Sequence, residues 1–116
     1  MYYKRNESFR FTFNEPVAGK LTKHEGNDMT TIDVDLLDVS TQGAKLKCVN
    51  TIELNKNTPI FLVFQLNTVS FQAAGNVVWI KKYPQSFEFG VHLDTDEMFQ
   101  QSITQQLKQI ARQRNK

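Results

Sequence analysis

The chain has 116 residues, of which 40% are hydrophobic and 22% charged, a composition typical of one globular domain and not of a disordered tail. No stretch approaches the roughly 20 apolar residues of a membrane helix, the N-terminal residues lack the apolar core of a signal peptide, and Cys48 has no second cysteine to pair with, so we expect a cytoplasmic protein. The net charge of +2 divides into +2 for residues 1–10, +4 for residues 107–116 and -4 for the body between them, which disfavours a protein that coats nucleic acid along its whole surface.

The first segment, residues 1–13, is predicted to be a cationic arm. It contains KRNESFR at residues 4–10, and arginine can donate two parallel hydrogen bonds to the edge of guanine, stack on a base or pair with phosphate. Phe9, Phe11 and Phe13 alternate with Arg10 and Thr12, so an extended arm places Arg10 on the face opposite the aromatic rings. That arrangement leaves its guanidinium available to a ligand. For the basic run at the other terminus, a solvated tail is the simpler interpretation.

The middle of the chain, residues 14–94, is predicted to form an antiparallel barrel. Six segments are rich in β-branched or aromatic residues or alternate with period two, and turn residues separate them. The long fifth segment is expected to bend or bulge near Gly75, and the polar residues 24–30 are expected to form a loop. The predicted strands are Pro16–Lys23, Thr31–Leu37, Ala44–Val49, Pro59–Leu66, Val69–Tyr83 and Ser86–Leu93.

Charges predict how the second and third of these strands pair. A hairpin centred near Ser40 places Asp35 opposite Lys45 and Asp33 opposite Lys47 on the solvated face. Two aspartates on one face also occur as paired acids in active sites. The lysines across the hairpin favour the structural interpretation.

The last segment, residues 95–116, is predicted to be the one helix. Asp94-Thr95-Asp96-Glu97 supplies a capping oxygen and acids for the first turn. A narrow apolar stripe follows at spacings of three and four residues: Phe99, Ile103, Leu107 and Ile110. We expect this stripe to dock on the barrel.

Residues that would indicate catalysis are scarce. His24 and His92 are single histidines in different elements, and neither nucleophile-elbow nor phosphate-loop motifs occur. We therefore expect no enzyme, no metal site and no cofactor. Cys48 continues the inward pattern of its strand and is interpreted as a core residue, since a reactive thiolate needs exposure and positive neighbours.

The residues after the second strand, DVSTQG at 38–43, combine acceptors with turn chemistry. Asp38 and Ser40 can bond backbone amides or ligand donors such as the guanine amino group, and Gly43 permits positive φ or a close backbone approach. On its own this pattern is also that of an ordinary hairpin turn.

Taken together, KRNESFR, DVSTQG, GNVVW and FEFGVHLD resemble the PilZ domain family in motif content and order, over nearly the whole chain. The resemblance implies an all-β fold, a six-stranded antiparallel barrel with a C-terminal α-helix. It also implies that the domain binds cyclic di-GMP, a bacterial second messenger. In that family an arginine-rich N-terminal segment wraps the ligand against a [D/N]-x-S-x-x-G turn, which Asp38, Ser40 and Gly43 match in full.

The arginine motif of this chain departs from the family pattern. When Arg10 is aligned with the last arginine, Arg5 and Asn6 fall on the two adjacent arginines of many members, so the spacing is R-x-x-x-x-R. Asn6 brings an amide donor without charge, which lowers affinity unless Lys4 or Arg5 compensates. The resemblance thus implies a cyclic di-GMP site of Lys4, Arg5, Asn6, Arg10, Asp38, Ser40 and Gly43. Trp79 either borders this site or, as the simpler interpretation, packs in the barrel.

The resulting expectation is a non-enzymatic receptor whose arm is ordered by cyclic di-GMP and which signals to a separate, unidentified protein without membrane insertion. The alternative is a protein-interaction adaptor that has lost the nucleotide, as the Asn6 departure suggests. A nucleic-acid-binding barrel is less favoured, because the glycine-spaced aromatic signature of RNA-binding sheets is missing.

Overall fold

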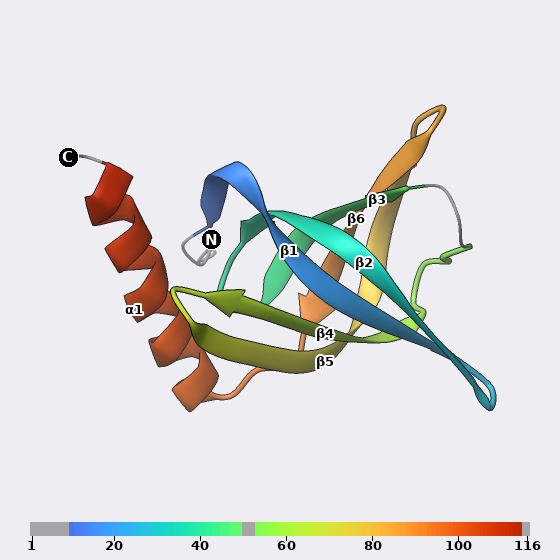
Figure 1. Ribbon diagram of the computed structural model, residues 1–116. Coiled ribbons are helices and arrows are strands. Elements are labelled where there is room, and N and C mark those ends of the chain that lie inside the picture. The colour runs from blue at the N-terminus through green and yellow to red at the C-terminus, as the bar shows by residue number, and fades with distance from the viewer. Residues whose placement is uncertain (1–9, 50–52, 115–116) are drawn as a thin grey trace, which may run out of the picture.

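The computed structural model describes residues 10–49 and 53–114, which form six strands and one helix (Figure 1). In chain order these are β1 (Phe11–Glu25), β2 (Asp28–Val39), β3 (Gly43–Val49), β4 (Pro59–Leu66), β5 (Val69–Lys82), β6 (Ser86–Leu93) and α1 (Glu97–Arg114).

The strands close into the predicted six-stranded antiparallel barrel, in the order β1-β2-β3-β6-β5-β4. The alternation of apolar residues determined the bounds of β4 and β6 correctly. The bounds of the other four strands change. The largest changes are in β1, which starts at Phe11 and extends to Glu25, and in β2, which starts at Asp28. The expected loop over residues 24–30 is therefore only a tight turn, in which Gly26 has a φ of 59°. Residues 11–13, predicted as part of the arm, belong to a barrel strand.

The predicted charge register between β2 and β3 is wrong. Asp35 lies opposite Lys47, not Lys45, and Lys45 lies opposite Asp38. Asp33 does not meet a lysine of β3, because its carboxylate forms an ion pair with Lys20 of β1.

The position of the hairpin turn explains this difference, because the pairs nearest the turn, Val39 with Ala44 and Asp38 with Lys45, centre it between Thr41 and Gln42 and not near Ser40. A β-bulge then adds a further shift. The register shifts between Leu36 and Asp38, so Leu37 is an extra residue in β2 without a partner in β3. The inserted residue also shifts the alternation of inward and outward side chains by one position. The bulge brings Asp38 onto the outward face beside Lys45.

A second bulge lies in β5, at Val78 and not at the expected position of Gly75, because the register with β6 shifts between Val77 and Trp79. Gly75 instead pairs with both neighbouring strands, Ile60 of β4 and Leu93 of β6. A Cβ at Gly75 would overlap the carbonyl oxygen of His92, so a close strand approach requires the glycine there.

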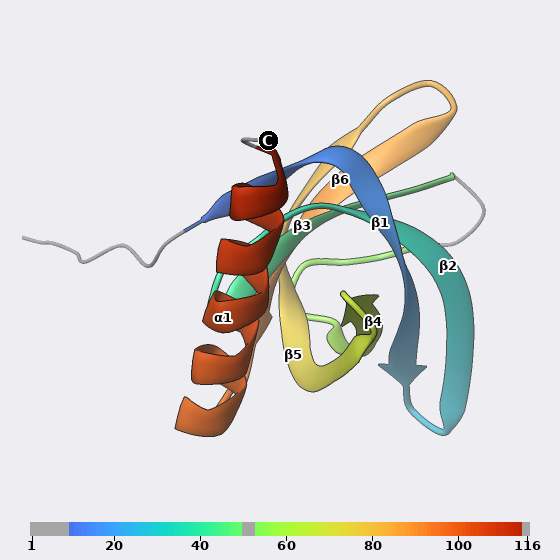
Figure 2. The same ribbon diagram turned by 60° about the vertical axis from the view of Figure 1, so that its left-hand side comes forward.

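The helix α1 lies across the end of the barrel at which β1 begins (Figures 1 and 2). Asp96 caps it, since its Oδ1 accepts a 2.8 Å hydrogen bond from the amide of Phe99. The predicted stripe docks on the barrel: Ile103 and Leu107 are fully buried, and Phe99 packs edge-on against Phe71 of β5 at 5.4 Å between ring centroids.

A polar contact fixes the same helix to the β4–β5 turn. Asn67 and Thr68 have φ values of 51° and 71°, as a two-residue hairpin requires. The Asn67 amide donates to the backbone oxygen and to Oε1 of Gln106, a buried residue of α1. The buried amide is thereby satisfied, and α1 is held against the barrel by more than apolar packing.

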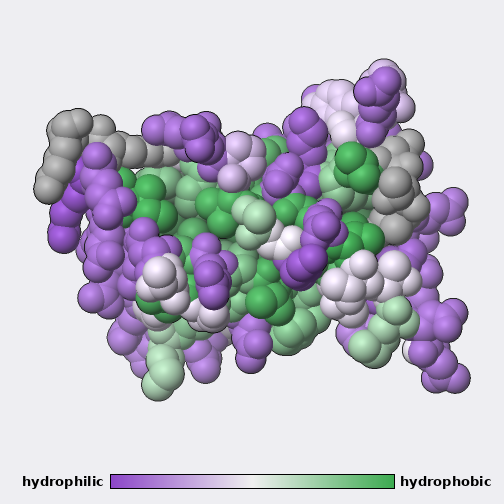
Figure 3. All heavy atoms as spheres, viewed as in Figure 1, coloured by the Kyte–Doolittle hydropathy of each residue, from purple (hydrophilic) through white to green (hydrophobic). Residues whose placement is uncertain are grey.

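The surface differs between the helix and the barrel. In Figure 3 hydrophilic atoms cover the α1 side, while apolar atoms reach the surface over the middle of the barrel. A groove of about 650 Å³ lies on this part of the barrel, lined by residues of β2, β1, β4 and β5. Its walls include Lys20, Asp33 and Val63.

Candidate functional site

The candidate site is built around residues 38–43, which join β2 to β3 and are called the β2–β3 turn here. Both the amide and the hydroxyl of Ser40 donate to the carbonyl of Gly43, at 2.9 and 3.4 Å. Ser40 is buried, and its hydroxyl closes the turn by donating to a carbonyl, where the sequence suggested bonding to backbone amides. Two residues of the turn remain outward, Thr41 and Gln42, and neighbouring elements hold their carbonyls.

Those neighbours are the end of β6 and the segment that leads into α1. The amide of Leu93 donates to the Gln42 carbonyl at 2.9 Å, and the Thr95 hydroxyl donates to the Thr41 carbonyl at 2.8 Å. Gln100, one turn into α1, donates to the Thr95 hydroxyl at 3.1 Å. The turn is therefore braced from two sides and presents a preformed surface.

Arg10 and Asp38 come together at the start of this turn. The Arg10 Nη1 donates to Asp38 Oδ1 at 2.7 Å, and their side chains are 53% and 10% exposed. The strand pairing of Phe11 with Val39 and of Thr12 with Asp38 places the start of β1 beside the end of β2. The guanidinium thus covers a nearly buried carboxylate and keeps part of its donor fork directed to solvent.

Gly43 is required by strand packing. A Cβ at this position would lie 2.9 Å from the carbonyl oxygen of Val91 on β6, closer than real Cβ contacts come. The sequence suggested two reasons for a glycine at position 43, a positive φ or a close backbone approach, and the structure shows the close approach. Among the glycines of the described residues, a positive φ occurs at Gly26.

One row of residues crosses the outer face of the barrel from this site. Cross-strand pairing aligns Thr12 with Asp38, Asp38 with Lys45, Lys45 with Gly90, and Gly90 with Trp79. Paired residues point to the same face of a sheet, so this outer row continues the site over β1, β2, β3, β6 and β5. The bulges at Leu37 and Val78 are what bring its two ends into line.

Trp79 lies on the outer face and not in the core. Its side chain is 40% exposed, and a Cβ at Gly90 would overlap its Nε1 and lie 2.5 Å from its Cε2. The simpler sequence interpretation, packing in the barrel, is therefore corrected to packing on the outside of it, at the end of the row that begins at Arg10 and Asp38.

Other charges line the row. Lys45 Nζ is 3.7 Å from Glu88 Oε1, and His92 Nε2 is 3.7 Å from Asp94 Oδ1. His92 is exposed and lies opposite Gly43. Lys45 was predicted only as a structural partner of Asp35, because the predicted hairpin was centred near Ser40 and the observed one is centred between Thr41 and Gln42.

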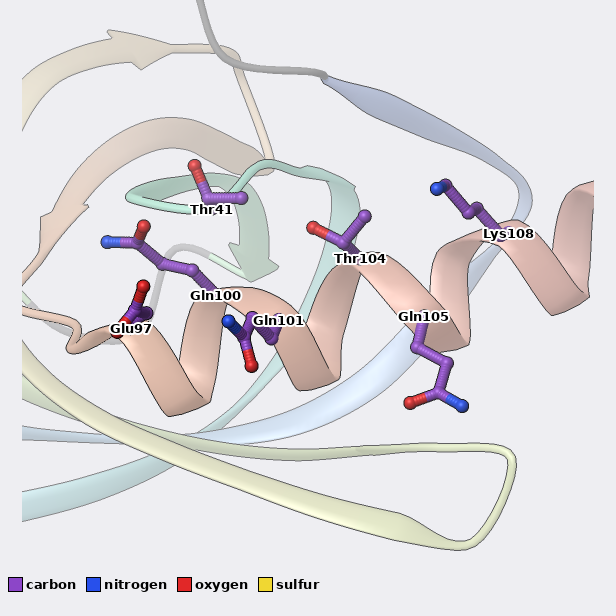
Figure 4. Close-up of a pocket in the computed structure, with 7 residues that line it drawn as sticks. All are labelled: Thr41, Glu97, Gln100, Gln101, Thr104, Gln105 and Lys108. Atoms are coloured by element: carbon purple, nitrogen blue, oxygen red, sulfur yellow. The ribbon is translucent and has the colours of Figure 1, made fainter.

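A groove of about 500 Å³ runs between the turn and α1 (Figure 4). Thr41 faces it from the turn, and Gln100, Thr104 and Lys108 face it from successive turns of the helix. Its walls are polar and uncharged except at the ends, where Glu97 and Lys108 lie.

Of the predicted site residues, Arg10, Asp38, Ser40 and Gly43 are together at one end of the barrel. Lys4, Arg5 and Asn6 lie outside the described residues.

Cys48 has the position expected of a core residue. It is buried in β3, and burial raises the pKa of its thiol from 9.0 to about 11.

Two kinds of feature are absent from residues 10–49 and 53–114. No group of three or more His, Cys, Asp or Glu side chains there is placed to hold a metal ion. Within the same ranges no helix has both the length and the apolarity needed to cross a membrane.

Solved structures share this fold. The PilZ domain of YcgR from Escherichia coli, solved with c-di-GMP, has a TM-score of 0.71 at 14% identity and covers 96% of this chain and 97% of its own. MotI/DgrA, an inhibitor of motility from Bacillus subtilis, has a TM-score of 0.72 at 16% identity and covers 98% of this chain and 54% of its own.

The MrkH–c-di-GMP complex from K. pneumonia has a TM-score of 0.70 at 12% identity and covers 97% of this chain and 56% of its own. The chain thus spans little more than half the length of MotI/DgrA and MrkH. Identities this low establish the fold alone, and no curated protein sequence matches. The sequence pattern of the PilZ domain matches residues 4–109, and with the closed six-stranded barrel and its C-terminal helix this shows that the chain belongs to the PilZ domain family.

Proposed function

We propose that the chain is a non-enzymatic receptor domain for cyclic di-GMP. The observation that carries this proposal is the contact between Arg10 and Asp38 at the start of the β2–β3 turn. It combines a forked cationic donor with a carboxylate acceptor on one outward surface, and these are the two groups that the edge of guanine pairs with. The shared fold with a PilZ domain solved with c-di-GMP supports the same ligand.

Each described residue has a role in this proposal. Arg10 binds the O6 and N7 edge of a guanine or a phosphate, and Asp38 both orients Arg10 and accepts from the guanine amino group. Ser40 holds the turn and offers its oxygen to the ligand, while Gly43 lets β3 approach β6 closely enough to shape the surface. A few charge-assisted hydrogen bonds at roughly 1.5–3 kcal/mol each suffice for a micromolar dissociation constant, about -8.2 kcal/mol, after ordering costs are subtracted.

The rest of the proposed site is the N-terminal arm. Arg5 takes the place of the first arginine of the family motif, Asn6 donates an amide hydrogen bond, and Lys4 supplies charge that Asn6 lacks. Binding draws the arm over the β2–β3 turn, and the ordered arm or the α1 surface is then recognised by a separate protein in the bacterial cytoplasm. Hydrogen exchange tests this step: amides of residues 2–9 become protected at saturating ligand, and unchanged exchange in a saturated complex would refute it.

Calorimetric titration with cyclic di-GMP tests the receptor function itself. We expect saturable heat for the wild type and much weaker binding for Asp38→Ala, with GMP as the control for a single guanine. Absence of heat and of chemical-shift changes at millimolar ligand would refute the proposal and favour the adaptor that the Asn6 departure suggests. Binding of single-stranded nucleic acid that is steeply salt-dependent and indifferent to Asp38→Ala would instead favour the third hypothesis.

A further inference from the structure

The side of the barrel away from α1 carries two projecting hairpin tips. The strands β1 and β2 stay paired up to the two-residue turn at one tip. At the other tip the amide of Tyr83 donates to the carbonyl of Ser86 at 2.8 Å, which closes the connection between β5 and β6. Both tips point away from α1 and stand apart from each other in Figures 1 and 2. We call residues 24–30 the acidic tip and residues 81–87 the basic tip.

The two tips carry opposite charges. The acidic tip contains Glu25 and Asp28 and neither Lys nor Arg. The basic tip contains Lys81 and Lys82 and neither Asp nor Glu. Glu25 pairs with the buried Lys23 at 3.0 Å, but within residues 10–49 and 53–114 no ion pair involves Asp28 or Lys82. Each tip therefore presents a charge that its own surroundings do not neutralise.

Exposed apolar side chains gather at the same side of the barrel. The structure describes five exposed large hydrophobic side chains, and three of them lie here: Met29 in the acidic tip, Tyr83 in the basic tip and Val49 at the end of β3. Because β3 lies between β2 and β6 in the barrel, Val49 lies between the two tips. Apolar side chains that gather beside unneutralised charges are typical of a surface that contacts another protein.

A second copy of this chain has the chemistry that complements these tips. In a two-fold symmetric dimer the same patch of each copy meets the other, so the acidic tip of one copy lies opposite the basic tip of its partner, and this contact occurs twice. The same symmetry brings Met29 of each copy to Tyr83 of the other, and a thioether packs favourably against an aromatic ring. Hairpins that are paired up to their turns keep the tips in place before association, which lowers the entropy that association costs.

We propose that the chain forms a two-fold symmetric dimer through its acidic and basic tips. Arg10 and Asp38 lie at the other end of the barrel, so the dimer leaves the β2–β3 turn uncovered, and this inference does not depend on the receptor proposal. Two hairpin tips form a small contact compared with the roughly 800 Å² per partner of a standard interface, so we expect a dimer in reversible exchange with the monomer.

Sedimentation equilibrium over a concentration series tests the dimer. We expect the wild type to pass from the monomer mass to twice that mass as its concentration rises, and added salt to weaken the association. Asp28→Lys places a cation opposite Lys82, and Lys82→Glu places an acid opposite Asp28. Each variant should associate with itself about tenfold or more weakly than the wild type, because like charges then meet at both contacts. Both positions are exposed, and circular dichroism checks that the fold is retained.

Glu15→Lys is the matched control for these variants. Glu15 is an exposed acid of β1 outside both tips, so its reversal changes the net charge by the same amount as Asp28→Lys. This variant should dimerise as the wild type does. Equal weakening in Glu15→Lys would mean that net charge alone governs the association, and it would overturn the proposed contact.

A mixture of the two tip variants gives the sharpest result. Asp28→Lys and Lys82→Glu should each remain monomeric where the wild type dimerises, yet form a heterodimer with each other, because opposite charges again meet at both contacts. Both substitutions in one chain should restore self-association for the same reason. A wild type that stays monomeric at millimolar concentration, tip variants that associate as the wild type does, or a mixture that stays monomeric would overturn the proposal. None of these results bears on cyclic di-GMP binding.

Discussion

Replacing Arg10 by alanine should separate ligand binding from stability. The ion pair with Asp38 is short, at 2.7 Å, but the Arg10 side chain is 53% exposed. An ion pair of this exposure contributes about 0.2–1 kcal/mol to folding. Removing Arg10 also uncovers the Asp38 carboxylate, so water replaces the lost partner. The unfolding midpoint should therefore fall by no more than about 4 °C.

The effect of Arg10→Ala on binding should be larger. Hydrogen bonds to charged groups contribute about 1.5–3 kcal/mol each, so loss of one such bond to the ligand weakens cyclic di-GMP binding by about 10- to 150-fold. The assay pairs calorimetric titration with thermal unfolding of the same protein samples. A loss of affinity accompanied by a small change of midpoint indicates a residue that contacts the ligand.

Lys20→Ala is the matched control. Lys20 forms the same kind of ion pair between β1 and β2, with Asp33, and its side chain is 65% exposed. This variant loses the same unit of charge, so it should show a similar small change in midpoint with unchanged affinity. Wild-type affinity in Arg10→Ala would remove Arg10 from the site, and equal weakening in Lys20→Ala would mean that only long-range charge attracts the ligand.

Three further predictions concern the scaffold. Gly75→Ala should destabilise the barrel by about 3 kcal/mol, because the added Cβ meets the backbone of β6. The Cβ of Gly26→Ala meets nothing within 4 Å, so this variant should lose only about 1 kcal/mol, from the φ of 59°. Urea unfolding compares the two variants, and equal losses of stability would contradict the packing argument. Ile103→Ala should lower the free energy of unfolding by about 2–5 kcal/mol in the same measurement, while Gln105→Ala, at an exposed position of α1, should leave it nearly unchanged. Equal stability of the two variants would mean that the packing of α1 does not contribute to the cooperative unfolding unit. Burial raises the pKa of the Cys48 thiol from 9.0 to about 11, so the neutral thiol favours the folded state. The stability of the wild type should therefore fall relative to that of Cys48→Ala as the pH rises from 9 to 11. Parallel pH profiles of stability for the two proteins would contradict this prediction.

The fold was largely predictable because apolar alternation is a local signal. The strands β4 and β6 have the predicted bounds, and the stripe through Ile103 and Leu107 docks as its spacing indicates. Each of these features depends on which residues are apolar within one element, and the sequence states that directly.

The register was not predicted correctly, because the centre of the β2–β3 hairpin and the position of a bulge are both decided by how the strands meet. Nothing in the sequence around Leu37 or Val78 distinguishes these residues as extra ones in a ladder. Each bulge shifts the alternation of inward and outward side chains by one position, and the two thereby turn Asp38 and Trp79 to the outer face. The sequence therefore identified the turn but not the row that extends from it.

The closure of the barrel has a consequence for how such a domain communicates. In the described part of the chain every strand is hydrogen-bonded on both sides, so a partner has no vacant backbone edge to extend by β-augmentation. A protein that binds this barrel must therefore recognise its side chains. The same closure removes the template on which sheets of neighbouring molecules aggregate.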